Sequence, residues 1–234
     1  MTEAQRGTII FDLDGTLVDS APDLANALDL LLLERGHAPL GLANVRPLIG
    51  HGIAELVRKG LAERSDLLPP DRLAQAVERF LVHYTANLSR HSSVYPGAAV
   101  ALETLQRAGW RLVVCTNKLE ASARRLLQDL GLLHLFVLVA GPDTFGAAKP
   151  DPAHLLGCLP ASRPASYRAV MVGDSEVDTA AAKAAKMPVI AVSWGYARRP
   201  IAELEPDRVA DRMQDVPDFV DALMAEPTGK FKAE

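Results

Sequence analysis

Two carboxylates, Asp12 and Asp14, stand near the start of the 234-residue chain and are followed at once by Gly15 and Thr16. Carboxylate oxygens are hard ligands of the kind that Mg²⁺ prefers. A carboxylate can also attack phosphorus, and the resulting aspartyl-phosphate splits a hydrolysis into two easier steps. The second carboxyl, Asp14, is placed to protonate a leaving alcohol and later to activate water. Gly15 allows the backbone to approach a ligand closely.

Three later positions supply further charges and hydroxyls. Thr116 and Asn117 follow an apolar run, Lys149 precedes Pro150, and Asp174 follows another apolar run. The Thr116 hydroxyl and the Lys149 ammonium would balance charge on a transferring phosphoryl group. Asp174 would add a second carboxylate to a metal site. Because phosphoryl transfer is mostly positioning and charge stabilisation, this set of residues indicates that chemistry.

Short apolar runs place most of these groups at the ends of predicted strands. The runs are residues 8–11, 111–115, 136–140, 168–172 and 189–192. Runs of this length are typical of strands buried on both faces, and helical patterns lie between several of them. This alternation predicts an α/β fold with a doubly wound parallel, Rossmann-like sheet. Ligands bind beyond the carboxyl ends of such strands, so we expect the polar groups to converge there.

One stretch interrupts the alternation with amphipathic helices and no convincing strand. Its apolar residues recur at helical spacing, as in Leu24, Leu28, Leu31 and Leu32. The chain returns to the strand–helix pattern near Tyr95. We therefore predict a helical domain inserted after the first strand. The predicted domains are an α/β core of residues 1–18 and 95–234 and a helical domain of residues 19–94.

Four motifs resemble, in order, those of the haloacid dehalogenase superfamily. They are Asp12-Leu13-Asp14-Gly15-Thr16, Thr116-Asn117, Lys149-Pro150 and Gly173-Asp174-Ser175-Glu176-Val177-Asp178. The resemblance covers nearly the whole chain. It implies an α/β core with a helical cap and phosphoester hydrolysis with Mg²⁺. The dehalogenating branch lacks the second aspartate of the first motif, which is present here as Asp14 and favours phosphate ester hydrolysis.

The resemblance also implies a role for each matching residue. Asp12 would be the nucleophile and a metal ligand, and Asp14 the general acid/base with its backbone carbonyl on the metal. Lys149 would stabilise charge, and Asp174 would be a direct metal ligand. Phosphate would be held by Thr116, Asn117, Gly15 and Thr16. Orienting contacts behind the ligands are assigned to Asp178 and Ser175.

The substrate is a narrower question. The first motif with its extension to Ser20, the run Ile49-Gly50-His51-Gly52, the run Thr116-Asn117-Lys118 and Trp194-Gly195-Tyr196 are similar to the phosphoglycolate phosphatase branch. Related phosphatases for pyrophosphate and sugar phosphates share much of this pattern, and phosphomutases share the cap location. A phosphate-binding scaffold and a phosphorylatable signalling module are the non-enzyme alternatives. His51 and Lys59 are open as substrate contacts.

The composition is that of an ordinary globular protein. A net charge of −4 and a pI near 5.9 argue against a nucleic-acid or anionic-membrane partner. The polar start, residues 1–7, carries no signal-peptide pattern, so the expected location is cytoplasmic. The expected partner is a small phosphate ester, and both a monomer and a homodimer remain open.

Overall fold

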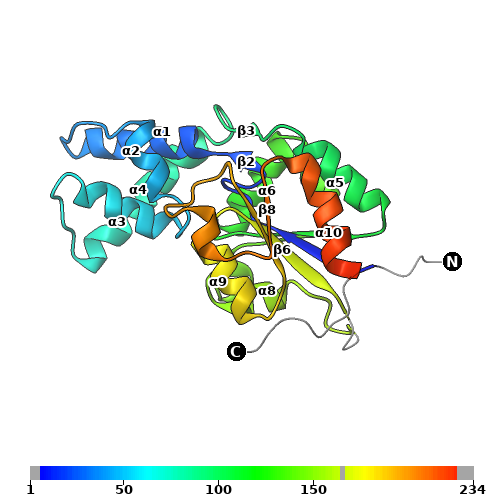
Figure 1. Cartoon of the computed structure of the whole chain (residues 1–234). Helices are drawn as coiled ribbons and strands as arrows, with labels where there is room; N and C mark the ends of the chain where they lie inside the picture. The colour runs from blue at the N-terminus through cyan, green and yellow to red at the C-terminus, as the bar shows by residue number, and fades with distance from the viewer. Residues whose placement is uncertain (1–5, 164–166, 226–234) are drawn as a thin grey trace.

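A six-stranded parallel sheet forms the centre of the molecule in a computed structural model that describes residues 6–163 and 167–225 (Figure 1). In sheet order the strands are β5 (Leu138–Ala140), β4 (Arg111–Cys115), β1 (Thr8–Phe11), β6 (Ala169–Gly173), β7 (Val189–Val192) and β8 (Arg208–Ala210). The predicted doubly wound α/β fold is confirmed. The ends of the predicted core domain, residues 1–5 and 226–234, lie outside the described residues.

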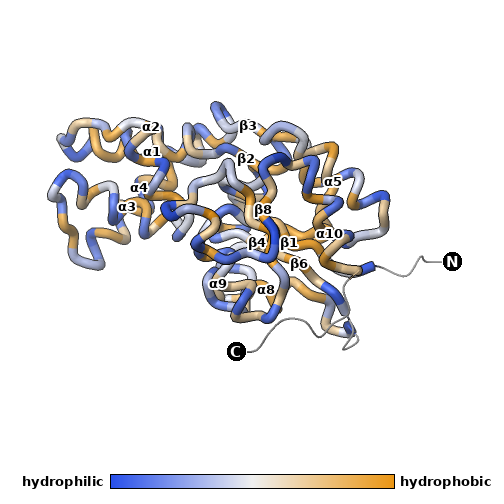
Figure 2. Tube along the Cα trace, viewed as in Figure 1, coloured by the Kyte–Doolittle hydropathy of each residue, from blue (hydrophilic) through white to orange (hydrophobic). Residues whose placement is uncertain are grey.

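Alternate side chains of the central strand are buried on opposite faces of the sheet. Ile9 and Phe11 belong to a core shared with α5, α6 and α10, whereas Ile10 belongs to a second core shared with α8 and α9. These helices are Ala98–Arg107, Glu120–Asp129, Val216–Ala225, Pro152–Gly157 and Glu176–Ala184. Figure 2 shows the hydrophobic strands between these layers. Burial on both faces explains why three of the four residues of β1, Ile9, Ile10 and Phe11, are apolar.

Helices fill the segment between β2 (Val18–Asp19) and β3 (Ser93–Val94). We call residues 20–92 the helical insert; it lies at one end of the sheet in Figure 1. Its elements are α1 (Ala21–Glu34), α2 (Leu42–Val45), the 3-10 turn η1 (Arg46–Leu48), α3 (Ile53–Ala62) and α4 (Pro70–Ala86). Four leucines of α1, Leu24, Leu28, Leu31 and Leu32, belong with Phe80 and Tyr84 of α4 to the larger core.

The two chain crossings between the sheet and the helical insert run side by side. β2 and β3 pair antiparallel, with Val18 opposite Val94. Beside this ribbon, the buried carboxylate of Asp23 accepts hydrogen bonds from the backbone N–H groups of His91 and Ser92 and from the Ser92 hydroxyl. Since each bond goes to a charged acceptor, the start of α1 and the end of the insert are firmly joined.

The structure differs from the predicted strands in a few places. β5 begins at Leu138 and not at residue 136, because Leu133–Leu135 forms a 3-10 turn before it. β8 was not predicted, since it is a three-residue edge strand with one fully buried side chain. The two-residue strands β2 and β3 are too short to give a periodic signal. Among the described helices, none combines the length and the apolar character needed to cross a membrane.

The remaining elements are short. They are α7 (Pro142–Phe145), between β5 and the α8 helix, and the 3-10 turns η3 (Ile201–Leu204) and η4 (Met213–Asp215), on either side of β8.

Candidate active site

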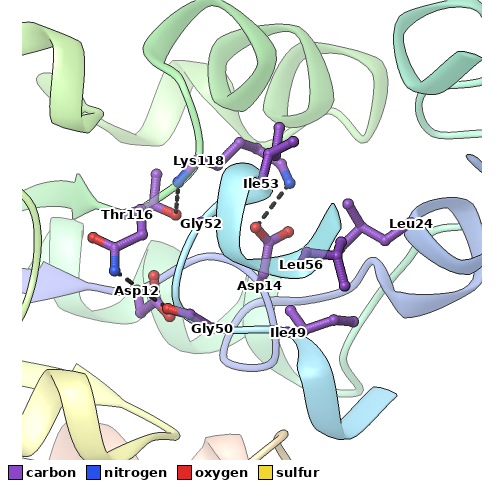
Figure 3. Close-up of a pocket in the computed structure, with 11 residues that line it drawn as sticks. Asp12, Asp14, Leu24, Ile49, Gly50, Gly52, Ile53, Leu56, Thr116 and Lys118 are labelled. Carbon is purple, nitrogen blue, oxygen red and sulfur yellow. Dashed lines mark hydrogen bonds and ion pairs between the residues drawn. The ribbon is translucent and has the colours of Figure 1, made fainter. Parts of the chain in front are cut away.

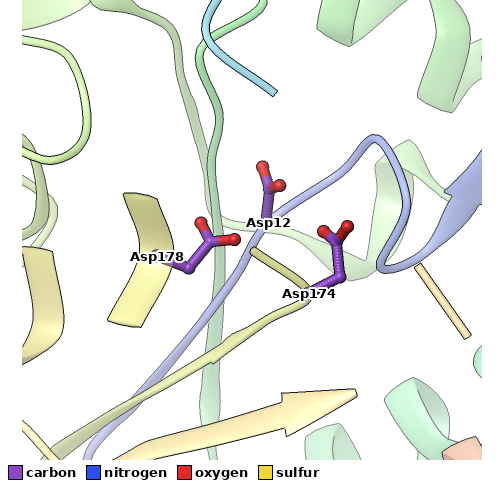
Figure 4. A group of neighbouring side chains, drawn as sticks. All are labelled: Asp12, Asp174 and Asp178. Atoms are coloured by element: carbon purple, nitrogen blue, oxygen red, sulfur yellow. The ribbon is translucent and has the colours of Figure 1, made fainter. Parts of the chain in front are cut away.

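The polar residues singled out in the sequence meet beyond the carboxyl ends of three neighbouring strands. Asp12 and Asp14 follow β1, Thr116 follows β4, and Asp174 follows β6. Lys149 reaches the same place from the loop between α7 and α8. Figure 3 shows Asp12, Asp14 and Thr116 around a pocket. Figure 4 shows the carboxylates of Asp12, Asp174 and Asp178 directed at a common space. The sheet edge therefore gathers residues that are far apart in the sequence.

Asp12, Asp174 and Asp178 form a buried acidic cluster in which one carboxylate oxygen from each residue lies within 4.8 Å of the other two. The Nζ atom of Lys149 is 2.7 Å from Oδ1 of Asp12 and 2.7 Å from Oδ1 of Asp178. Burial raises the pKa of Asp12 to about 7, although the ion pair with Lys149 acts in the opposite direction. An all-oxygen donor set with more negative than positive charge can hold a hard divalent cation.

Asp174 is held in place through both of its carboxylate oxygens. Oδ1 accepts the Thr16 hydroxyl at 2.9 Å, and Oδ2 accepts the backbone N–H of Tyr196 at 2.7 Å. The turn after β7 comes so close that a Cβ on Gly195 would lie 2.1 Å from Cβ of Asp174. Gly15 has φ +92°, and a Cβ there would lie 2.5 Å from Oδ2 of Asp174, so both positions require glycine. The pKa of Asp174 is raised by its burial and by the neighbouring acids.

The Asp178 side chain accepts hydrogen bonds both from the residue that precedes α9 and from Lys149. Its Oδ2 accepts hydrogen bonds from the backbone N–H and the hydroxyl of Ser175, at 3.0 Å and 2.7 Å, and its Oδ1 accepts the Lys149 ammonium. Both oxygens of Asp178 are thus engaged with protein groups. Within the described ranges, Oδ2 of Asp12 has no hydrogen-bond partner, so Asp12 is the member of the cluster with a free oxygen.

Asp14 faces the helical insert and not the acidic cluster. Its Oδ2 is 2.8 Å from Nζ of Lys118, and its Oδ1 accepts the hydroxyl of Ser20. Figure 3 shows this ion pair among aliphatic side chains of the helical insert. The two carboxylates of the first motif therefore have different partners, Lys149 for Asp12 and Lys118 for Asp14, which suits them to different tasks.

The pocket between these groups is small and bounded from both sides. The sheet supplies Asp12, Asp14, Thr116, Asn117 and Lys118, and the insert supplies Leu24, Ile49, Gly50, Gly52, Ile53 and Leu56. The free space that remains between these side chains is about 30 Å³. A single buried water needs roughly 10–15 Å³ on the same scale, so the side chains enclose room for two or three waters.

Asn117 connects the Lys149 loop to the helical insert. Its side chain accepts the backbone N–H of Lys149 at 2.9 Å, donates to the Lys149 carbonyl at 2.9 Å and donates to the Gly50 carbonyl at 3.2 Å. With both amide hydrogens donated to carbonyls, this side chain positions protein groups. Thr116 lines the pocket beside it, and its hydroxyl accepts the backbone N–H of Lys118 at 3.2 Å.

We expect Asn117→Ala to lower kcat by about 10²-fold, because the loop that holds Lys149 loses two hydrogen bonds and displacements near 1 Å cost that much. The substitution removes no side chain that the structure places on Asp12. Steady-state kinetics and circular dichroism would measure activity and folding. Asn44→Ala removes a comparable side chain-to-backbone bond, to the Leu40 carbonyl in the helical insert, and should leave kcat unchanged. A kcat within threefold of wild type for Asn117→Ala would contradict the expectation.

Several site residues were not assigned a role from the sequence. Lys118 and Ser20 hold Asp14, and the Tyr196 hydroxyl accepts the backbone N–H of Ser20 at 2.9 Å and donates to Asp19 at 2.7 Å. All lie within the runs quoted for the phosphoglycolate phosphatase branch, which was the available signal.

The two open substrate contacts lie elsewhere. Nδ1 of His51 is 3.4 Å from Arg198, and Lys59 pairs with Glu55 at 3.2 Å. Neither residue lines the pocket as described. Thr16, assigned to phosphate, has its hydroxyl on Asp174.

Comparison with known proteins gives a consistent picture. The family model of the haloacid dehalogenase-like hydrolases matches residues 9–192. A phosphoglycolate phosphatase of Mesorhizobium japonicum is 42% identical over 207 residues, which cover 87% of this chain and 90% of that protein. A phosphoglycolate phosphatase of Rhodospirillum rubrum is 43% identical over 216 residues, covering 91% of this chain and 90% of that protein.

Solved structures agree. The crystal structure of a predicted phosphoglycolate phosphatase from Haemophilus somnus superposes with a TM-score of 0.85 at 29% identity, covering 93% of this chain and all of that one. The matched region of the family model contains the acidic cluster, Asp14, Lys118 and Lys149.

Proposed function

The chain belongs to the haloacid dehalogenase-like hydrolases and is a phosphoric monoester hydrolase, and from that premise we propose that it hydrolyses 2-phosphoglycolate with Mg²⁺ through an aspartyl-phosphate on Asp12. One observation carries the proposal: Asp12 belongs both to the buried acidic cluster and to the lining of the pocket. A metal site and a ligand site therefore share a single carboxylate. The identity to phosphoglycolate phosphatases supports the choice of substrate.

In the first step, Oδ2 of Asp12 attacks phosphorus and the bond from phosphorus to the ester oxygen breaks. Asp14 transfers a proton to that oxygen, so glycolate leaves as the alcohol and the phosphoryl group stays on Asp12. Lys149 keeps Asp12 oriented through its other oxygen and offsets charge on the phosphoryl group. The Thr116 hydroxyl lies on the pocket wall, where it can hold a phosphoryl oxygen.

In the second step, Asp14 takes a proton from water as the water oxygen attacks phosphorus. The bond between phosphorus and Asp12 breaks, inorganic phosphate is released, and both carboxyl groups return to their starting states. One residue thus acts first as an acid and then as a base, which the order of the two steps requires.

The acidic cluster fits a magnesium ion through two of its three carboxylates. Asp12 and Asp174 would hold it, with the backbone carbonyl of Asp14, while Asp178 keeps Lys149 and Ser175 in place. Bound Mg²⁺ would neutralise charge on the phosphoryl oxygens.

We further propose that residues 19–94 act as a cap over a core of residues 1–18 and 95–234. Four apolar side chains of the insert, Leu24, Ile49, Ile53 and Leu56, close the pocket on the side away from the sheet. An apolar cover of this kind excludes water while the phosphoryl group moves to Asp12.

Phosphate release is the direct test of this function. We expect 2-phosphoglycolate to give the highest kcat/KM among 2-phosphoglycolate, sugar phosphates and pyrophosphate, and EDTA to abolish the activity until Mg²⁺ is restored. Metal-dependent hydrolysis that favours another ester would contradict the substrate. Isomerisation of a sugar phosphate without net phosphate release would contradict hydrolysis and establish a phosphomutase.

A further inference from the structure

Lys118 is a buried cation where the sheet meets the helical insert. Its side chain is 2% exposed, its Nζ atom is 2.8 Å from Oδ2 of Asp14, and the same atom lies 4.9 Å from the ring centre of Tyr84 on α4. Burial opposes the charge, but the Asp14 carboxylate more than offsets it and raises the pKa of Lys118 above its ordinary value. Lys118 therefore remains charged, and the ammonium has three N–H donors to satisfy.

The pocket has one positive side chain of its own. Of the described residues that line it, Lys118 alone is cationic, whereas Asp12 and Asp14 are acidic and four others are aliphatic. Lys149 stands behind Asp12, at the end of the pocket where phosphorus must be attacked. A ligand with a second anionic group has therefore one place in which that group can be neutralised, beside Lys118.

The position of Asp14 sets the distance between the ester oxygen of the substrate and the second anionic group beside Lys118. A general acid must come within hydrogen-bond reach of the leaving oxygen, about 2.6–3.2 Å. Lys118 is 2.8 Å from the same carboxylate, so it stands next to the leaving oxygen on the side away from phosphorus. In 2-phosphoglycolate, a single carbon separates the ester oxygen from the carboxylate. We propose that Lys118 binds this carboxylate and so selects small phosphate esters with an anionic group next to the ester carbon.

This inference rests on the proposed function and adds that Lys118 changes its partner when the substrate binds. In the described structure Lys118 is paired with Asp14. When a carboxylate-bearing substrate enters, Lys118 exchanges the Asp14 carboxylate for that of the substrate, and Oδ2 of Asp14 becomes free to carry the proton that goes to the leaving oxygen. A phosphate ester without a second anionic group leaves Lys118 paired with Asp14 and is hydrolysed slowly.

A matched pair of substrates tests the proposal. 2-Hydroxyethyl phosphate has the same chain length as 2-phosphoglycolate but carries a hydroxyl in place of the carboxylate. We expect Lys118→Met to lower kcat/KM for 2-phosphoglycolate by about 10²-fold or more, because the substrate carboxylate loses its buried cationic partner. The same variant should change kcat/KM for 2-hydroxyethyl phosphate by only a few-fold. Lys118→Gln keeps a donor for Asp14 and should lose the same preference, which covers the case in which the methionine variant does not fold.

Lys59→Met is the control, because Lys59 is a lysine of the helical insert that does not line the pocket and is paired with Glu55. It should keep the wild-type preference for the carboxylate. Equal losses for both substrates in the Lys118 variants would overturn the proposal and leave Lys118 as a support for Asp14. A preference retained in either folded Lys118 variant, or lost in Lys59→Met, would also overturn it. If wild type does not prefer 2-phosphoglycolate to 2-hydroxyethyl phosphate, it is the proposed substrate that fails.

Discussion

Asp12→Asn should lower kcat by at least about 10⁴-fold while leaving the protein folded. The amide removes the nucleophilic oxygen, and loss of a nucleophile is among the costliest single changes in an enzyme. The same change takes one negative charge out of a buried cluster that holds three carboxylates and one ammonium. We therefore expect the variant in EDTA to melt no lower than wild type, and added Mg²⁺ to stabilise it less than wild type. Phosphate release and thermal melting would measure both effects.

The covalent intermediate supplies a second measurement on the same residue. Wild type quenched in acid during turnover should retain phosphate that hydroxylamine releases, as an acyl phosphate does, and Asp12→Asn should retain none. Asp221→Asn is a suitable control, since Asp221 is an exposed carboxylate paired with Arg6 at 3.3 Å. It should behave as wild type in both assays. Turnover above one per cent of wild type by pure Asp12→Asn would refute the nucleophilic role.

Lys149→Met should destabilise the metal-free protein by about 3–5 kcal/mol, because removing one partner of a buried ion pair leaves uncompensated charge behind. Lys149 is 1% exposed and contacts both Asp12 and Asp178 at 2.7 Å. Its loss should also lower kcat by about 10²–10³-fold, the usual cost of one charge-stabilising donor. Urea unfolding in EDTA and steady-state kinetics would measure the two effects, and Mg²⁺ should restore part of the lost stability by replacing the positive charge.

A double variant separates the electrostatic cause from a packing defect. Combining Lys149→Met with Asp178→Asn should cost less stability than the sum of the two single changes, because the second removes a charge that the first left unpaired. Lys183→Met provides the surface comparison, since its pair with Glu205 at 3.0 Å is exposed and should contribute no more than roughly 1 kcal/mol. Additive losses in the double variant would contradict the electrostatic explanation.

The sheet and the acidic cluster were predictable because both follow from local pattern. A strand buried on both faces is mostly apolar, as residues 9–11 are, and parallel strands bring their carboxyl ends to one edge. Asp12 and Asp174 therefore had to lie close together once the strands were identified. The same reasoning gave the broad fold of the helical segment, whose leucines recur at helical spacing.

The partners of individual side chains were not predictable in this way. Lys118 pairs with Asp14 across 104 positions of sequence, and Asn117 holds both the Lys149 loop and Gly50. Such pairings depend on side-chain directions where the insert packs on the sheet, and no periodic pattern records them. β8 was missed for a related reason, because an edge strand with exposed positions has no continuous apolar run.

The paired strands β2 and β3 hold the two ends of the helical insert together, whatever the length of the insert. Val18 lies opposite Val94 and Asp19 opposite Ser93, so the chain leaves the sheet and returns at neighbouring points. The entropy of closing a loop grows only slowly with the number of residues in it. A change in the length of the insert therefore adds little to the entropy of closing the chain between these strands. Under the proposed role of the insert as a cap, such changes would alter the substrate side of the pocket while the strand ends that hold the acidic cluster keep their places.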